Sequence, residues 1–147
     1  MRLTILEDAE KEPGLFFWAG SIEQSVLELW LSERGWSIPD DLKFLWLQTG
    51  GGDFFETETI FGVFNGLWAD DYVEDVNRYQ RSEGMPAHFL AFHCGIQFSA
   101  VDLTRHKYVF LHKKTFAVLE EFSSLESWYV DGIRPLYQQT YSLPSAD

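Results

Sequence analysis

Apolar side chains recur every three to four residues in "SIEQSVLELWLSERG", residues 21–35, which is the periodicity of an amphipathic helix. Ser21 and Gln24 have the spacing of a capping box at its start, and Gly35 can adopt the left-handed conformation that ends a helix. We therefore predict a helix over this segment. The face expected to be buried consists of Ile22, Val26, Leu29 and Trp30.

A second helix is predicted almost immediately afterwards, in residues 38–51. Pro39 suits the first turn, and Asp40 and Asp41 complement the positive end of the helix dipole. So short a connection predicts a helical hairpin packed on a larger element. The core-facing stripe is expected to be Leu42, Leu45 and Trp46.

Three consecutive glycines, Gly50, Gly51 and Gly52, follow this helix. A phosphate-binding loop needs a strand before its glycines and a lysine opening a helix after them. Here a helix comes first, an aromatic run follows, and nearby carboxylates would repel an anion. We predict that the glycines end a helix and start a sheet, and that they bind no phosphate.

The middle of the chain alternates between strand and helix signals. Residues 53–64 and 67–69 are predicted strands, with Asn65-Gly66 as a hairpin turn. Residues 70–84 form a predicted third helix, in which Asp71 and Glu74 are a capping pair. The inward side of this helix is expected to carry Val73, Val76, Tyr79 and Gln80.

Three or four short strands with tight turns are predicted in residues 88–122. Two of them alternate, with Ile96, Phe98 and Ala100 opposing Gln97 and Ser99, and with Val109 and Leu111 opposing Tyr108 and Phe110. Residues 123–132 predict a last helix, capped by Ser123 and Glu126 and facing inward through Leu125 and Trp128. Helices thus bracket sequential strands.

We conclude that residues 1–147 form a single α+β domain, with a central, mainly antiparallel sheet and flanking helices. The core is expected to extend over residues 21–132. The first dozen residues and the tail "SLPSAD" are expected to be flexible.

The formal net charge of −12 comes entirely from the first half of the chain. Residues 1–75 hold 16 acidic against 4 basic residues, while residues 76–147 hold 7 of each. A field of this sign repels phosphate backbones and attracts basic partners. Direct nucleic-acid binding is therefore not expected; solubility alone is the other explanation of the charge.

The single cysteine, Cys94, suits a reducing compartment. The N-terminus lacks the pattern of a signal peptide, and no apolar run has the length of a membrane span. The expectation is a cytoplasmic protein that does not enter a membrane.

Candidate chemistry is weak in this sequence. The histidines and the cysteine lack the paired spacings of structural zinc sites, so we predict no metal and no cofactor. A small hydrolase using two carboxylates is an alternative, but sequence gives neither their separation nor a shifted pKa. No catalytic residue is predicted. The side chains considered were His88, His93, Cys94, His106 and His112, and the carboxylates Asp53, Glu56, Glu58, Asp70, Asp71, Glu74 and Asp75.

Aromatic residues interleaved with acids surround the glycine-containing turns after residue 52. Aromatic side chains ringed by charge are typical of a protein-interaction surface, although burial in the core is the other interpretation. The residues predicted to bind a partner are Asp53, Phe54, Phe55, Glu56, Glu58, Phe61, Phe64, Trp68, Asp70 and Asp71.

The segment "RGWSIPDDLKFLWLQTGGG" resembles the signature of the SUKH superfamily, which includes the fungal cell-wall assembly regulator and many bacterial immunity proteins. The matching positions are Gly35, Ile38-Pro39, Asp40 or Asp41, Leu42, Phe44-Leu45 and Thr49-Gly50-Gly51. The strands "PAHFLAFHCGIQFSAVDL", ending at Asp102, and the segment "VFLHKKTFAVLEEFSSLESWY" are similar to later parts of that family. Thr49 stands where the family usually has Asn, and the acidic residue of the turn before the second strand is missing at Gly95-Ile96.

This resemblance implies an α+β fold and a non-catalytic function in protein binding. In its immunity form, the protein would neutralise a cognate toxin by direct contact, and an acidic inhibitor suits a basic, nuclease-type toxin domain. The alternative is a housekeeping regulatory or interaction module inside the cell. The resemblance carries no catalytic residue onto this chain.

Overall fold

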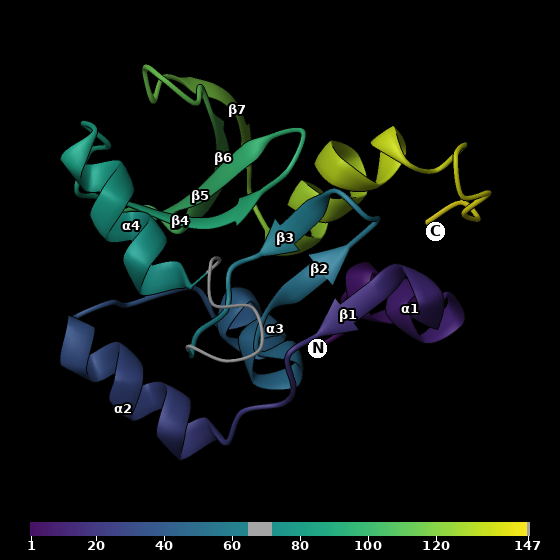
Figure 1. The fold of residues 1–147 in the computed structure, drawn as a ribbon, viewed down its shortest axis with the longest axis horizontal. Coiled ribbons are helices and arrows are strands. Elements are labelled where there is room, and N and C mark those ends of the chain that lie inside the picture. Colours follow the sequence, from purple (N-terminus) through teal and green to yellow (C-terminus); the bar gives the residue numbers. More distant parts are fainter. Residues whose placement is uncertain (65–71, 147) are drawn as a thin grey trace.

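Seven strands form one antiparallel sheet in which each strand pairs with its neighbour in the sequence (Figure 1). The structure is a computed structural model, and it describes residues 1–64 and 72–146. Its helices and sheet confirm the predicted α+β class. The strands are β1 (Phe16–Trp18), β2 (Gly52–Phe54), β3 (Glu58–Ile60), β4 (Phe89–Cys94), β5 (Phe98–Asp102), β6 (Lys107–Leu111) and β7 (Val118–Phe122).

Helices lie on both sides of this sheet (Figure 1). The α-helices are α1 (Thr4–Lys11), α2 (Gln24–Arg34), α3 (Asp40–Thr49), α4 (Val73–Ser82) and α5 (Leu125–Ser127). A short 3-10 turn, η1 (Pro13–Leu15), precedes β1; α5 continues into the π-helix η3 (Trp128–Ile133) and the 3-10 turn η4 (Arg134–Leu136). Among the described residues, no helix has the length and apolarity needed to cross a membrane.

Both faces of the β4–β6 region are covered, so its strands are buried along nearly their whole length. The predicted alternation in β5 and β6 therefore separates two buried faces instead of a buried and an exposed one. Ser99 and Phe110 are register partners on the face covered by the C-terminal segment, where the Trp128 indole reaches the Ser99 hydroxyl. The opposite face is covered partly by α4.

Asn77 of α4 joins that helix to the sheet at a β-bulge. Its buried amide donates to the carbonyl of Ala91 at 2.9 Å and accepts from the Ala91 amide at 2.7 Å. β3 pairs with β4 only at His93 and Cys94, so Asn77 satisfies the backbone beyond the point where β3 ends. Asn77 thus takes the place of a strand neighbour.

The triple glycine ends α3 and starts β2, as predicted. Gly50 is the left-handed C-cap, with φ 69°, and its amide donates to the Trp46 carbonyl. Gly51 has φ 92°, and a Cβ on it would lie 2.7 Å from the carbonyl oxygen of Phe61. The glycines therefore permit both the backbone turn and the close approach of neighbouring chain segments.

The predicted second helix is confirmed, with Leu42, Leu45 and Trp46 buried, but the predicted face of the first helix is largely wrong. In α2 the buried residues are Leu27, Trp30 and Leu31, and the predicted Ser21–Gln24 capping box does not form because the helix begins at Gln24. Apolar residues lie around most of this helix, so periodicity allows more than one inward face. Ring contacts of Trp30 with Trp36 and Trp46 select the face that is buried.

The predicted inward side of the third helix is also only partly right. In α4, Val73 is buried and Val76 and Gln80 are half-buried, whereas Tyr79 is 61% exposed. The predicted strand at residues 67–69, the Asn65-Gly66 turn and the Asp71 cap lie outside the described residues.

The expectation that the first dozen residues are flexible is wrong for residues 4–11, which form α1. Asp8 of this helix is buried. Its carboxylate accepts hydrogen bonds from Arg134 Nε at 2.7 Å and from the Tyr129 hydroxyl at 2.6 Å. The Glu126 carboxylate accepts from the amide and hydroxyl of Thr4 at the start of α1. Contacts more than 120 residues apart in sequence thus hold this helix, and no local pattern reveals them.

The last predicted capping box lies one residue later than expected. Ser124 and Ser127 form it, while Glu126, the residue predicted to complete it, caps α1 instead. Leu125 and Trp128 face inward as predicted, and both are buried.

We expect Gly51→Ala to lower the free energy of unfolding by at least about 2 kcal/mol, because it adds left-handed backbone strain to a steric clash. Urea unfolding followed by tryptophan fluorescence measures this loss. Gly14→Ala is the matched control, since a Cβ there meets nothing within 4 Å, and it should change stability by less than about 0.5 kcal/mol. Equal effects of the two substitutions would contradict the conclusion that the backbone conformation and close contacts of Gly51 require glycine there.

Candidate functional site

Four of the residues predicted to bind a partner are buried in the core: Phe54, Phe55, Glu58 and Phe61. The prediction that they form a surface is therefore wrong. Phe55 stacks on Tyr137 and Tyr141, with ring centroids 4.7 and 5.6 Å away, and these tyrosines come from the far end of the chain. The aromatic run after the glycines is packed by the C-terminal segment.

The remaining predicted residues within the described part of the chain differ in exposure. Glu56 is exposed and Phe64 is 42% exposed, while Asp53 is half-buried and accepts a hydrogen bond from Thr59 Oγ1 at 2.8 Å. Trp68, Asp70 and Asp71 lie outside the described residues.

Glu58, a carboxylate with no exposed surface, is the centre of a buried polar network. Its Oε1 lies 2.6 Å from His93 Nε2, and its Oε2 accepts from the Tyr137 hydroxyl and from the Ile96 amide at 3.0 Å. Beyond His93, Nδ1 lies 2.8 Å from Ser99 Oγ, which accepts from Trp128 Nε1 at 2.9 Å. Each carboxylate oxygen thus has protein partners, as a buried charge requires.

The direction of these hydrogen bonds follows from the donors available. Indole Nε1 can only donate, so Ser99 Oγ accepts from Trp128, and an ionised Glu58 can only accept, so His93 donates to it from Nε2. In the neutral imidazole, Nδ1 then has no proton and accepts the hydroxyl proton of Ser99. The chain of bonds is complete with a neutral imidazole and an ionised carboxylate.

The pKa shifts agree with this assignment. Burial lowers the pKa of His93 and outweighs the opposing effect of the nearby Glu58. Burial alone would raise the pKa of Glu58, but hydrogen bonds from His93, Tyr137 and the Ile96 amide keep it below its usual value.

Ser99, His93 and Glu58 have the composition of a hydrolytic triad. All three are fully buried, however, and the serine hydroxyl is already engaged by Trp128 and His93. A substrate could reach the serine only if the core opened. The arrangement is that of a structural network, and it carries no nucleophilic site.

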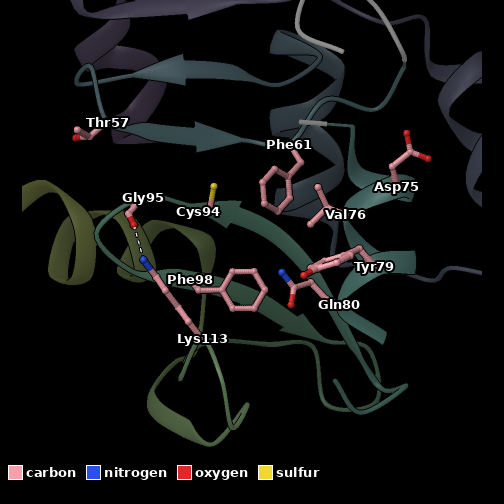
Figure 2. A pocket seen from close by; sticks show the side chains of 10 residues that line it. All are labelled: Thr57, Phe61, Asp75, Val76, Tyr79, Gln80, Cys94, Gly95, Phe98 and Lys113. Atoms are coloured by element: carbon pink, nitrogen blue, oxygen red, sulfur yellow. Dashed lines mark hydrogen bonds between the residues drawn. The ribbon is translucent and has the colours of Figure 1, made fainter. Parts of the chain in front are cut away.

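An open groove of about 630 Å³ lies on the other side of β4, between α4 and the turns that follow β4 and β6 (Figure 2). Phe61, Val76 and Phe98 supply its apolar surface, and Cys94 of β4 faces it. Lys113 crosses one end, where its Nζ donates to the Gly95 carbonyl at 3.0 Å. The other residues lining it are Thr57, Asp75, Tyr79, Gln80 and Gly95.

His93 and Cys94 face opposite sides of β4, as the sequence predicted: one enters the buried network and the other lines the groove. Within residues 1–64 and 72–146, no three or more His, Cys, Asp or Glu side chains are grouped as metal ligands.

Sequence reasoning missed both the network and the groove. It predicted Glu58 on a partner-binding surface and assigned His93 no site, because their 35-residue separation hides the contact. The usable signal was an acid and a histidine that both lie in predicted strands, with Ile60 and Phe61 shortly after Glu58 and with His93 between Phe92 and Cys94.

Neither a scan against protein-family models nor a search of the curated proteins returns a match for this chain. The resemblance to the SUKH superfamily therefore rests on the short motifs alone and stays a prediction.

The network predicts a pH-dependent stability. Because the folded-state pKa of His93 lies below the ordinary value of 6.5, the unfolded chain binds a proton there that the native state does not. Stability should therefore fall as pH drops below 6.5, with a limiting slope of about 1.4 kcal/mol per pH unit from this group. Glu58, whose pKa is also lowered, adds a further loss at more acidic pH.

Urea unfolding between about pH 7.5 and about pH 5.5 measures this dependence. His93→Gln should be less stable than the parent at the upper pH, by about 1–3 kcal/mol, since Ser99 loses its acceptor. The free energy of unfolding of this variant should also decrease less steeply as the pH is lowered. His88→Gln, at an exposed histidine, is the control and should retain the parent slope. An unchanged slope in His93→Gln would refute the assignment.

Proposed function

We propose that this chain is a non-catalytic protein-binding domain whose partner packs on the outward face of α2. The observation that carries the proposal is the exposure of Val26 (44%) and Leu29 (62%) on this helix. They are three residues apart and therefore share one side of it, opposite to the buried Leu27 and Leu31. Exposed aliphatic side chains on one helix face suit packing against another protein.

Two exposed carboxylates flank this apolar pair along α2. Glu23 lies three residues before Val26 and Glu33 four residues after Leu29, while the exposed Glu28 lies on a neighbouring side of the helix, 4.0 Å from Lys43 Nζ. The surface thus combines a small apolar centre with an acidic rim, which favours a partner with basic residues around an apolar contact. The net charge of −12 would speed the encounter with such a partner.

Burial of Ser99, His93 and Glu58 supports the non-catalytic part of the proposal, since the chain's triad-like side chains serve the core. The immunity function implied by the SUKH resemblance is one form of this proposal, in which the partner is a basic toxin domain. The alternative is a housekeeping interaction module that uses the same surface for another intracellular protein. A toxin-like gene beside the coding gene would favour the first, and its absence the second.

Replacing the apolar centre should weaken binding without unfolding the protein. For Val26→Ser/Leu29→Ser we expect an affinity loss of about tenfold to a hundredfold for the product of the adjacent gene, measured by titration calorimetry after co-expression. Leu136→Ser, at another exposed leucine, is the control and should bind normally. If the double variant binds and protects cells as well as the parent does, α2 is not the interface.

Reversing the acidic rim tests the electrostatic part separately. Glu28→Lys/Glu33→Lys should slow association by about tenfold at low salt, with the difference shrinking as ionic strength rises. The matched control is Glu10→Lys/Glu12→Lys, which makes the same change in net charge at exposed residues of the N-terminal segment. Equal slowing by both pairs would show that net charge acts without a local rim.

A further inference from the structure

We propose that the groove between α4 and the turns after β4 and β6 binds a small carboxylic acid bearing one aromatic or branched apolar arm. This site uses different residues from the α2 surface, so the inference goes beyond the proposed function and does not depend on it. Its occupant is a free small molecule, and the ligand class is defined by the groove's shape, its apolar surface and the one cation among the described residues that line it, Lys113.

The groove has the size and composition of a small-molecule site. Its volume of about 630 Å³ lies within the range of pockets that hold such ligands, roughly 300–1,000 Å³. Phe61, Val76 and Phe98 converge on its middle from the sheet and from α4 (Figure 2). An aromatic ring or a branched chain placed there would cover the exposed parts of Val76 and Tyr79 and would contact the edges of Phe61 and Phe98, which are otherwise buried.

Lys113 gives the groove a cation at one end (Figure 2). Its Nζ donates to the Gly95 carbonyl at 3.0 Å, and within the described part of the chain it makes no ion pair. An ammonium group has three donors, so two remain for a carboxylate. Among the described lining residues the carboxylate is Asp75, which lies at the far end and pairs with Arg78 at 2.9 Å, so it does not compete for Lys113.

Gln80 adds a polar group beside the apolar surface of the groove. Its half-buried side chain lies beside Phe98 and Tyr79 in Figure 2, and no hydrogen bond from its amide to another described residue is found. The amide can donate to a polar atom of a ligand whose arm rests on Phe98. The ligand's apolar arm, its carboxylate and a hydrogen-bond acceptor would therefore each contact a different part of the groove.

The charge distribution selects a monoanion. A cationic ligand would be repelled by Lys113, while a polyphosphate would meet, among the described residues lining the groove, only the ammonium of Lys113, in a chain of net charge −12. A single carboxylate pairs with Lys113 without further anionic groups to desolvate.

Cys94 provides an internal reporter, because it is the chain's single cysteine, is half-buried and lines the groove. The test uses 3-phenylpropanoate as the acid and 3-phenylpropanamide as its neutral counterpart of the same shape. We expect the acid to slow alkylation of Cys94 by iodoacetamide in a saturable manner and to give a matching dissociation constant by calorimetry.

Lys113→Gln should weaken binding of the acid by about tenfold or more, since a charge-assisted hydrogen bond is lost, and should leave the weak binding of the amide unchanged. Lys114→Gln is the matched control: it removes the same charge at the next residue, which does not line this groove, and should bind like the parent. The Val26→Ser/Leu29→Ser variant should also bind the acid normally, so that failure of one proposal is distinguishable from failure of the other.

Three results would overturn the proposal. The first is that acid and amide bind equally to the parent, or equally to parent and Lys113→Gln. The second is that the acid gives no saturable protection of Cys94. The third is that a peptide ending in phenylalanine binds much more tightly than the free acid with the same dependence on Lys113, which would make a protein C-terminus the occupant.

Discussion

The fold depends on keeping the Glu58 carboxylate satisfied inside the core. A buried charge without partners would cost several kcal/mol, so the segments that supply its hydrogen bonds must meet around it. They are β3, which carries Glu58, β4 with His93, the turn at Ile96, and the C-terminal segment with Tyr137. The carboxylate also requires glycine at position 95. A Cβ on Gly95 would lie 2.2 Å from Glu58 Oε1, because the acid occupies the space that a side chain would need.

Other carboxylates join distant segments in the same way, which changes the meaning of the acidic composition. Asp8 pairs with Arg134, and Asp41 of α3 accepts from the Tyr108 hydroxyl and from the Leu125 amide. Burial opposes ionisation of Asp102, but hydrogen bonds from Thr104 and Arg105 lower its pKa to about 2 and hold the turn after β5. Part of the net charge of −12 is therefore structural, and a basic partner would meet only the acids left outside, such as those along α2.

What the sequence predicted was local, and what it missed was long-range. The left-handed caps at Gly35 and Gly50 and the strands of the second half follow from spacing and turn chemistry within a few residues. Burial of Phe55 depends on tyrosines about eighty residues later, and an aromatic run beside acids looks the same whether another chain or the protein's own C-terminus covers it. The prediction of an exposed surface at Phe54, Phe55, Glu58 and Phe61 failed for that reason. The exposed face of α2 was missed because that helix is apolar on more than one side.

Strand β4 shows how one element serves the core and a surface at once. Successive side chains of a strand point to opposite faces, so His93 enters the network while Cys94 lines the groove. The network and the groove both contact Gly95. Its carbonyl accepts a hydrogen bond from Lys113 in the groove, and the absence of a side chain leaves space for Glu58 in the network. Burial is the largest cause of the lowered pKa of His93, and the charge of Lys113 is a minor one. The network therefore does not need the groove's cation, and Lys113 is left available to a ligand while the buried hydrogen bonds hold the fold.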